Sequence, residues 1–243
     1  MKKLFLLAAT LFSMSVFAQE QGDDNGFGLK IHAGICGDSY GSQKVEADLG
    51  VLSGSSDWQK DPNRSNKPLF GFSMDNRWYV ANPGNFGIAI DARWMDMAIG
   101  KSKWEKEGVE YQTATNLQIG LLMPGVIGTF YLDNEMAIDA FYNIGPSVAV
   151  SFAESSLETT NEAMKDALED TSWGFGFSHF IGAAFRYKVF QAGVEYNIAT
   201  LKSVDWFDDS DNDANEYVEN YINTMTDTKT KFNNFRIFLG FKF

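Results

Sequence analysis

The sequence has little of several things that would mark a common class of protein. Its single cysteine, Cys36, allows no disulfide within the chain, and its two histidines leave few side chains for acid–base chemistry. Its 20 lysine and arginine residues face 32 aspartate and glutamate residues, and the net charge of −12 argues against nucleic acid as a partner. Beyond the N-terminal segment, no run reaches the ~18 consecutive apolar residues of a membrane-spanning helix.

The N-terminal segment is typical of a secretory signal peptide. Lys2 and Lys3 precede an apolar run from Leu4 to Val16, which is too short to span a membrane, and small residues precede a cut after Ala18. We therefore predict a signal peptide at 1–18 and one exported domain at 19–243. A buried first helix is the alternative interpretation of the same run.

Most of the remaining chain alternates with period two, which is the pattern of β-strands and not of helices. The segments "FGFSMDNRWYV" (70–80) and "FGIAIDARWM" (86–95) each place large apolar residues on one face and small or polar residues on the other. Similar rows recur at residues 27–35, 136–152, 173–187 and 190–198, and in the closing "NFRIFLGFKF". The sequence thus predicts an all-β fold.

The connections between these segments alternate in length. Short ones are expected at 81–85, 133–135 and 188–189, and long ones at 36–68, 100–109, 153–172 and 202–229. This alternation is typical of an antiparallel up-and-down barrel with tight periplasmic turns and long extracellular loops, with both chain ends on the periplasmic side.

The strand count depends on Pro124, which cannot donate to a sheet. If Pro124 breaks its segment the chain has nine strands; if it lies in a bulge the chain has eight. Single-chain bacterial outer-membrane barrels have even numbers of strands, which favours eight. The bulge interpretation also keeps six residues in one phase: Leu117, Ile119, Leu121, Ile127, Thr129 and Tyr131.

Alternation alone leaves open whether the apolar face contacts lipid outside or a ligand inside, as in a soluble lipocalin-like barrel. The opposite face is rich in glycine, alanine and serine, which suits the crowded interior of eight strands. Aromatic residues gather near the short turns, as in a membrane-interface girdle. They are Trp78, Phe86, Tyr131, Tyr187, Phe190, Phe241 and Phe243.

The end of the chain resembles the C-terminal signature of Gram-negative outer-membrane barrels, in which apolar residues alternate before a terminal aromatic. Ile237, Leu239, Phe241 and Phe243 match this signature, although Phe238 stands where the common form has glycine. The resemblance implies that these residues form a signal that the barrel-assembly machinery recognises. A last strand of this kind would also pair with the first, which removes the unpaired edges that lipid cannot solvate.

Residues 27–243 as a whole resemble the small outer-membrane barrels that include OmpA-like and OmpX-like proteins. The hairpin "LLMPGVIGTFYLDNEMAIDAFYNIGPS" (121–147) is similar to the central hairpin of that family. The resemblance implies a monomer in the cell outer membrane, with outer-membrane lipid, the assembly machinery and an envelope or extracellular protein as partners. Family members serve envelope structure, adhesion, stress resistance and secretion, so it implies no single activity.

The inward face carries charges of both signs. We expect these residues in the lumen, together with Phe130, Phe141, Phe180 and Phe238, either as a gate along an ion path or as an ionic network that fills the lumen. The chain offers little else for chemistry, because Ser178 and His179 are consecutive on one strand and point to opposite faces. The predicted charged set is Lys30, His32, Asp75, Arg77, Asp91, Arg93, Asp139, Arg186, Glu195, Arg236 and Lys242.

The loops carry most of the excess negative charge. "DDSDND" (208–213) lacks the glycine and the final carboxylate of a calcium-binding EF-hand loop, so we expect no cofactor and no dedicated metal site. Thr159 with Glu162, and Asp213 with Glu216, match helix capping boxes and predict short helices in the loops.

These features together predict a non-enzymatic eight-stranded outer-membrane barrel with a role in envelope structure or surface interaction. Three alternatives stay open at this point: a barrel accessory to secretion or transport, a lipid-modifying enzyme, and a soluble ligand-binding barrel.

Overall fold

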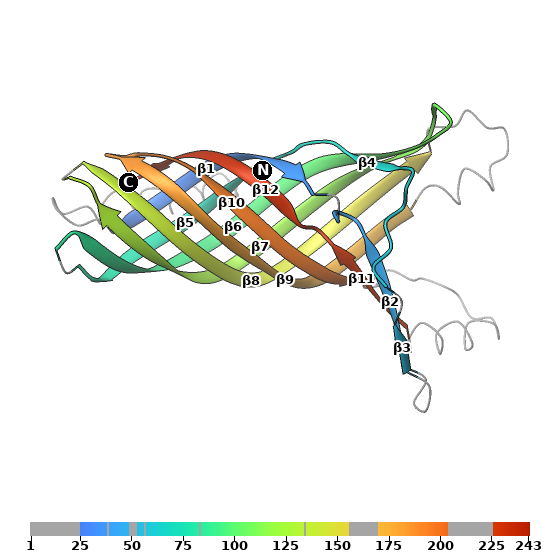
Figure 1. Ribbon diagram of the computed structural model, residues 1–243, viewed down its shortest axis with the longest axis horizontal. Helices are drawn as coiled ribbons and strands as arrows, with labels where there is room; N and C mark the ends of the chain where they lie inside the picture. The colour runs from blue at the N-terminus through green and yellow to red at the C-terminus, as the bar shows by residue number, and fades with distance from the viewer. Residues whose placement is uncertain are drawn as a thin grey trace, which may run out of the picture.

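A computed structural model describes most of the barrel domain (Figure 1). The predicted signal peptide at 1–18 and both predicted loop helices lie outside the described residues. In the described part of the chain, no helix has the length and apolar character needed to cross a membrane. The described ranges are 25–37, 39–48, 53–55, 57–82, 84–133, 135–155, 170–203 and 226–243.

Within the described ranges, twelve antiparallel strands form one continuous sheet, and eight of them close into a barrel. The ring order is β12-β1-β5-β6-β7-β8-β9-β10, and β10 pairs with β12 to close it. The eight ring strands are β1 (Gly26–Cys36), β5 (Leu69–Ala81), β6 (Phe86–Lys106), β7 (Val109–Tyr131), β8 (Met136–Ser155), β9 (Asp170–Tyr187), β10 (Phe190–Ser203) and β12 (Asn234–Lys242).

The other four strands occupy parts of the predicted loops 36–68 and 202–229. They are β2 (Gln43–Asp48), β3 (Ser53–Ser55), β4 (Arg64–Asn66) and β11 (Thr226–Lys231). Strand β4 pairs with β6, while β11 pairs with β10 and β2, so the sheet continues past the ring. Figure 1 shows β2 and β3 projecting from one end of the barrel. We call this the loop end.

The opposite end carries the predicted short turns and the closing strand. The Lys188 amide donates to the Glu135 carbonyl at 2.8 Å, and the Lys242 amide donates to the Val189 carbonyl at 2.7 Å, so neighbouring turns and the end of β12 lie together. Phe27 and Phe243 exchange amide-to-carbonyl hydrogen bonds of 2.9 and 2.7 Å. The predicted closure of the last strand on the first is therefore confirmed.

One predicted long loop is wrong. Residues 100–109 do not form a loop, because β6 continues to Lys106 and β7 begins at Val109. Glu107 and Gly108 join them with φ angles of 53° and 82°, which is the left-handed pair of a two-residue type I′ hairpin. Both strands thus extend beyond the ring at the loop end.

Pro124 lies in a bulge within one continuous strand, as predicted, and the ring therefore has eight strands. Leu122 has a φ of 50°, and the pairing of β7 with β8 shifts by one residue between Gly120 and Gly125. An extra residue reverses which side chains face inward. Ile127 and Thr129 are buried in the lumen, out of phase with Leu121, and Phe130 is outward and 50% exposed. The predicted common phase of this strand and the inward Phe130 are wrong.

The two surfaces of the barrel have opposite polarity. Large apolar side chains cover the outer face, where Ile31, Phe70 and Leu239 are each about 60% exposed, whereas charged and amide side chains are buried inside. Apolar surface of this extent is unstable in water and stable in lipid. This excludes the soluble lipocalin-like barrel and identifies the protein as an outer-membrane β-barrel.

Candidate functional site in the barrel lumen

The lumen holds all of the predicted charged residues, and each of them is buried. They come from seven of the eight ring strands and form three layers between the short-turn end and the loop end. Inward glycines make room for them; a Cβ atom at Gly28, for example, would meet the Asp75 carboxylate. The narrow interior of eight strands explains why such close approaches occur.

The central layer contains two arginines and two acids. Arg93 Nη2 lies 2.9 Å from Glu195 Oε2, and Arg236 Nη1 lies 2.8 Å from Asp96 Oδ1. Each arginine also reaches the other acid, at 3.5 Å for Arg93 to Asp96 and 3.3 Å for Arg236 to Glu195. Two positive and two negative charges thus balance in a closed square. Such a square is stable in a low-dielectric interior only because every charge has partners.

Asp96 is a member of this square that simple alternation from Arg93 misses. An extra residue at Trp94 shifts the pairing of β5 with β6 between Met74 and Asp75, and this brings Asp96 inward. His32 sits beside Asp96, with Nε2 3.6 Å from Asp96 Oδ2 and 3.5 Å from Arg236 Nη1. The histidine therefore borders the square without a nucleophile bonded to it among the described residues.

The next layer toward the short turns pairs Lys30 with Asp75 at 2.5 Å. The amide of Asn143 donates to Asp91 Oδ2 at 2.6 Å. The Lys30 ammonium also lies 5.1 Å from the ring centre of Phe141, within the range of cation–π attraction. Asp91, which has a neutral amide partner, thus lies beside Asp75, which is paired with a cation.

The layer nearest the short turns is organised around Asp139. Arg77 Nη1 lies 2.7 Å from one Asp139 oxygen, and the Thr129 hydroxyl donates to the other at 2.6 Å. Arg186 Nε is 3.6 Å from the same carboxylate, and Tyr79 contacts Thr129 at 2.5 Å. Thr129 joins this layer because the β7 bulge turns it inward.

Aromatic rings fill the space between the charged groups. Phe180 and Phe238 are almost fully buried, and the rings of Phe141 and Phe238 are 6.0 Å apart. The Arg93 guanidinium lies 4.4 Å from the Phe180 ring centre and that of Arg236 lies 5.0 Å from it, so the arginines stack on the ring as well as pairing with acids. Paired charges and packed rings together occupy the middle of the lumen.

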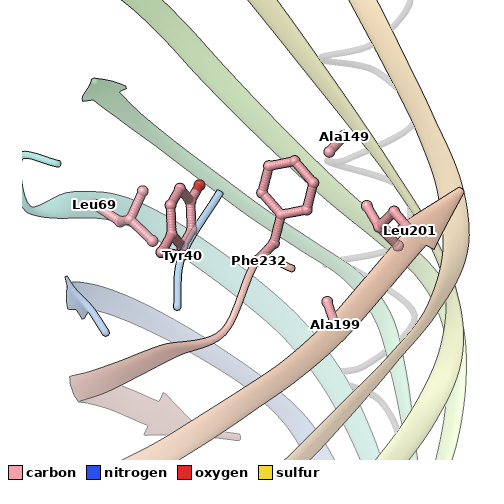
Figure 2. Packing of buried hydrophobic residues seen from close by; sticks show 6 residues of the cluster. All are labelled: Tyr40, Leu69, Ala149, Ala199, Leu201 and Phe232. Atoms are coloured by element: carbon pink, nitrogen blue, oxygen red, sulfur yellow. The ribbon is translucent and has the colours of Figure 1, made fainter. Parts of the chain in front are cut away.

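An apolar plate lies across the lumen at the loop end. Figure 2 shows the rings of Tyr40 and Phe232 between Leu69 on one wall and Ala149 and Leu201 on the other. The two rings meet edge to face at 5.4 Å. Leu69 can reach the centre only because Gly100, opposite, has no side chain to block it. None of this plate was predicted.

His179 and Ser178 have separate contacts on the two faces of β9. His179 faces outward and its Nδ1 lies 2.7 Å from the Tyr142 hydroxyl, while Ser178 is buried and accepts a hydrogen bond from Gln118 at 3.3 Å. Ser178 and His179 do point to opposite faces of the strand. In the described ranges, no group of three histidine, cysteine or acidic side chains is arranged to hold a metal ion.

The predicted assembly signal lies on the outer face of β12. Ile237, Leu239 and Phe241 are exposed there, and Phe241 contacts Phe190 and Phe243 at ring distances of 5.2 and 6.3 Å. The exposed apolar ladder is a structural fact, and its position in a membrane-interface girdle stays a prediction. Recognition by assembly machinery stays a prediction.

No protein-family model matches the chain, and no curated protein matches its sequence. Three solved structures cover most of it at low identity. They are the outer membrane protease OmpT from Escherichia coli (TM-score 0.48, 9% identity, 93% of this chain and 99% of that chain), Ail, the attachment invasion locus protein of Yersinia pestis (0.35, 10%, 89% and 99%), and the outer membrane protein OprG from Pseudomonas aeruginosa (0.36, 12%, 90% and 97%). Similarity at this level says nothing about activity, and the resemblance to OmpA-like and OmpX-like proteins stays a prediction.

Proposed function

We propose that this outer-membrane barrel is a sealed, non-catalytic protein that serves envelope structure or surface interaction. The observation that carries the proposal is the central square of Arg93, Asp96, Glu195 and Arg236, which is buried and in which each charge lies within 3.5 Å of an opposite charge. A conducting pore needs charges that water and ions can reach, and a catalytic site needs a group that is free to exchange protons. Charges that satisfy one another serve neither purpose.

Conductance tests the seal. Purified protein in planar lipid bilayers should give no steady porin-scale current, because paired side chains and rings fill the lumen. A porin inserted in the same bilayers provides the positive control. A large, reproducible channel from the pure protein would contradict the seal and favour the transport alternative.

The absence of catalysis is a separate part of the proposal. Phospholipid vesicles incubated with the purified barrel should release no fatty acid. Release that a His179→Ala variant loses would show a lipid-modifying enzyme instead, and would direct attention to the contact between His179 and Tyr142.

We further propose that the outward ladder of β12 is the segment that the barrel-assembly machinery recognises. Its side chains are exposed and apolar at the short-turn end, where an assembling strand would be presented. The thermodynamic cost of acids at this depth is small, because charges near the membrane interface cost about 0–1 kcal/mol. A large defect would therefore reflect recognition.

Replacing Phe241 and Phe243 with aspartate should lower the folded, heat-modifiable fraction in the outer membrane several-fold. Refolding of the same variant into detergent micelles should be nearly normal. Val109→Asp is the matched control, since Val109 is also exposed but lies at the hairpin tip of the loop end. Normal assembly of the double variant in cells would refute this role of the ladder.

A further inference from the structure

A hollow of about 180 Å³ opens above the apolar plate at the loop end. Phe232 and Ala149 belong to both the plate and the hollow, so the plate forms its floor. The indole of Trp104 stands in its wall, and Arg64 is the one charged side chain among its described lining residues. The remaining lining is mainly glutamine, asparagine, serine and threonine. This composition differs from the paired charges deeper in the lumen.

Asn116 gives the hollow a buried acceptor without a partner. The residue is 3% exposed, and its amide nitrogen donates to the Ser102 hydroxyl at 2.9 Å. Its carbonyl oxygen has no hydrogen-bond partner within the described protein. A buried polar atom left unpaired is costly. Other such atoms lie deeper in the lumen, and this oxygen is the one that belongs to a described lining residue of the hollow. A ligand hydroxyl would satisfy it once the amide group turns its oxygen toward the hollow.

Hydrogen bonds and a ring contact hold Arg64 in place at the same hollow. Its guanidinium lies 4.9 Å from the Trp104 ring centre and donates to Ser102 Oγ at 3.0 Å and to the Gly41 carbonyl at 3.3 Å. Gly41 has a φ of 77°, and a Cβ atom there would collide with the guanidinium. These contacts fix the plane of the Arg64 guanidinium against the indole ring of Trp104.

The charge of Arg64 has no acidic partner at ion-pair distance among the described residues. A third donor, Nε, bonds to Asn66 Oδ1 at 3.2 Å, which leaves two of the five guanidinium N–H groups for a ligand. Burial lowers the pKa of Arg64, although an arginine stays protonated at neutral pH. Asp61 attracts this charge only from beyond ion-pair distance, and a planar guanidinium with spare donors favours a carboxylate.

The rest of the lining favours a sugar ring over other carboxylates. Amide and hydroxyl side chains both donate and accept hydrogen bonds, which matches sugar hydroxyls, and the faces of indole rings suit the C–H faces of a sugar. A fatty acid would leave the polar lining unpaired. An amino acid would bring its ammonium group into a hollow in which Arg64, a cation, is the only charged residue among the described lining.

We propose that this hollow binds a single sugar ring that carries a carboxylate. Arg64 receives the carboxylate, Asn116 accepts from a ring hydroxyl, and Trp104 contacts the ring. The volume agrees with one ring and not with an oligosaccharide, since sites for drug-sized ligands measure roughly 300–1,000 Å³. The site is independent of the seal below the plate.

Saturation-transfer NMR on the full mature chain in detergent micelles, with D-galacturonate as the probe, tests this site. Galacturonate should bind saturably, and D-galactose and the methyl ester of galacturonate should bind at least about tenfold more weakly, because a hydrogen bond to a charged group contributes about 1.5–3 kcal/mol. Arg64→Met should abolish the difference between the acid and the neutral sugars. Asn116→Ala should weaken all three.

Trp94→Phe provides the matched control, because Trp94 is exposed on the outer face and does not line the hollow; it should leave binding unchanged. Equal binding of galacturonate and its methyl ester to the unaltered protein would overturn the proposal even if the Arg64 variant failed to fold. Absence of any saturable binding would overturn it as well. Polygalacturonate tests whether the site accepts a free monosaccharide or the end of a longer chain. It should compete with galacturonate only if the site accepts the end of a longer chain.

Discussion

The middle of the lumen contains a buried arginine and its mouth a half-buried one, and the two have different partners. Arg236 lies against Asp96 and Glu195 within a neutral square of four charges. Among the described residues, Arg64 at the mouth bonds to neutral oxygens, those of Gly41, Asn66 and Ser102. An arginine whose charge is matched holds strands together, whereas one without an ion-pair partner in the described part of the chain is available to a ligand. The charge balance of each layer therefore separates structural from binding residues.

The largest expected effect is a difference in the stability that the protein loses when each of these two arginines is replaced. Arg236→Met leaves Asp96 and Glu195 with only Arg93, and breaking a buried ion pair in this way should cost roughly 3–5 kcal/mol in free energy of unfolding. Arg64→Met leaves no described acid without an ion-pair partner. It should lower the free energy of unfolding by about 1–2 kcal/mol for the lost hydrogen bonds. Urea unfolding of both variants in lipid vesicles measures the difference.

A compensating variant sharpens the comparison. Adding Asp96→Asn to Arg236→Met removes the surplus negative charge, so the double variant should be more stable than Arg236→Met alone. If the two single arginine variants lost equal stability, charge balance would not be what separates the middle of the lumen from the mouth.

The sequence was sufficient to predict the ring, because every ring strand has an apolar face toward lipid and a polar face toward the lumen. Period-two alternation located these strands, and the Phe243 ladder correctly indicated closure. Alternation fails where one extra residue reverses the faces. Pro124 announced a bulge in β7, but only the observed shift shows that Thr129 turns inward and Phe130 outward.

Asp96 and the β6–β7 hairpin show two further limits. Nothing in the local sequence marks Trp94 as the extra residue that brings Asp96 into the central square. The hairpin lacks its usual sequence signal, since a glutamate, Glu107, occupies a left-handed position that usually holds asparagine or glycine. In each case a backbone irregularity, and not residue type, decides the local structure: the inward position of Asp96 and the tight turn between β6 and β7.

The residues that meet at the mouth could not be predicted from the sequence, for a different reason. Tyr40, Arg64, Asn116 and Phe232 come from separate segments, and three of these residues belong to connections and not to ring strands. No periodicity relates them, and they meet only because the connections fold back over the barrel. Binding residues are commonly placed on such connections, which a rigid sheet supports.

The smallest expected effect tests whether the apolar plate at the mouth is dry. Burial raises the pKa of Tyr40 above its ordinary value near 10. The folded protein therefore keeps a proton that the unfolded chain releases, so this contribution to stability is full below pH ~10 and decreases as the pH rises further. At pH ~11 the loss should approach about 1.4 kcal/mol, the equivalent of one pH unit. Tyr40→Phe cannot ionise, so its urea midpoint should fall less between pH ~8 and ~11 than that of the unaltered protein, while all other tyrosines cancel in the difference. Equal slopes for the two proteins would mean that water reaches Tyr40, and the plate could then not serve as a dry floor for the hollow above it.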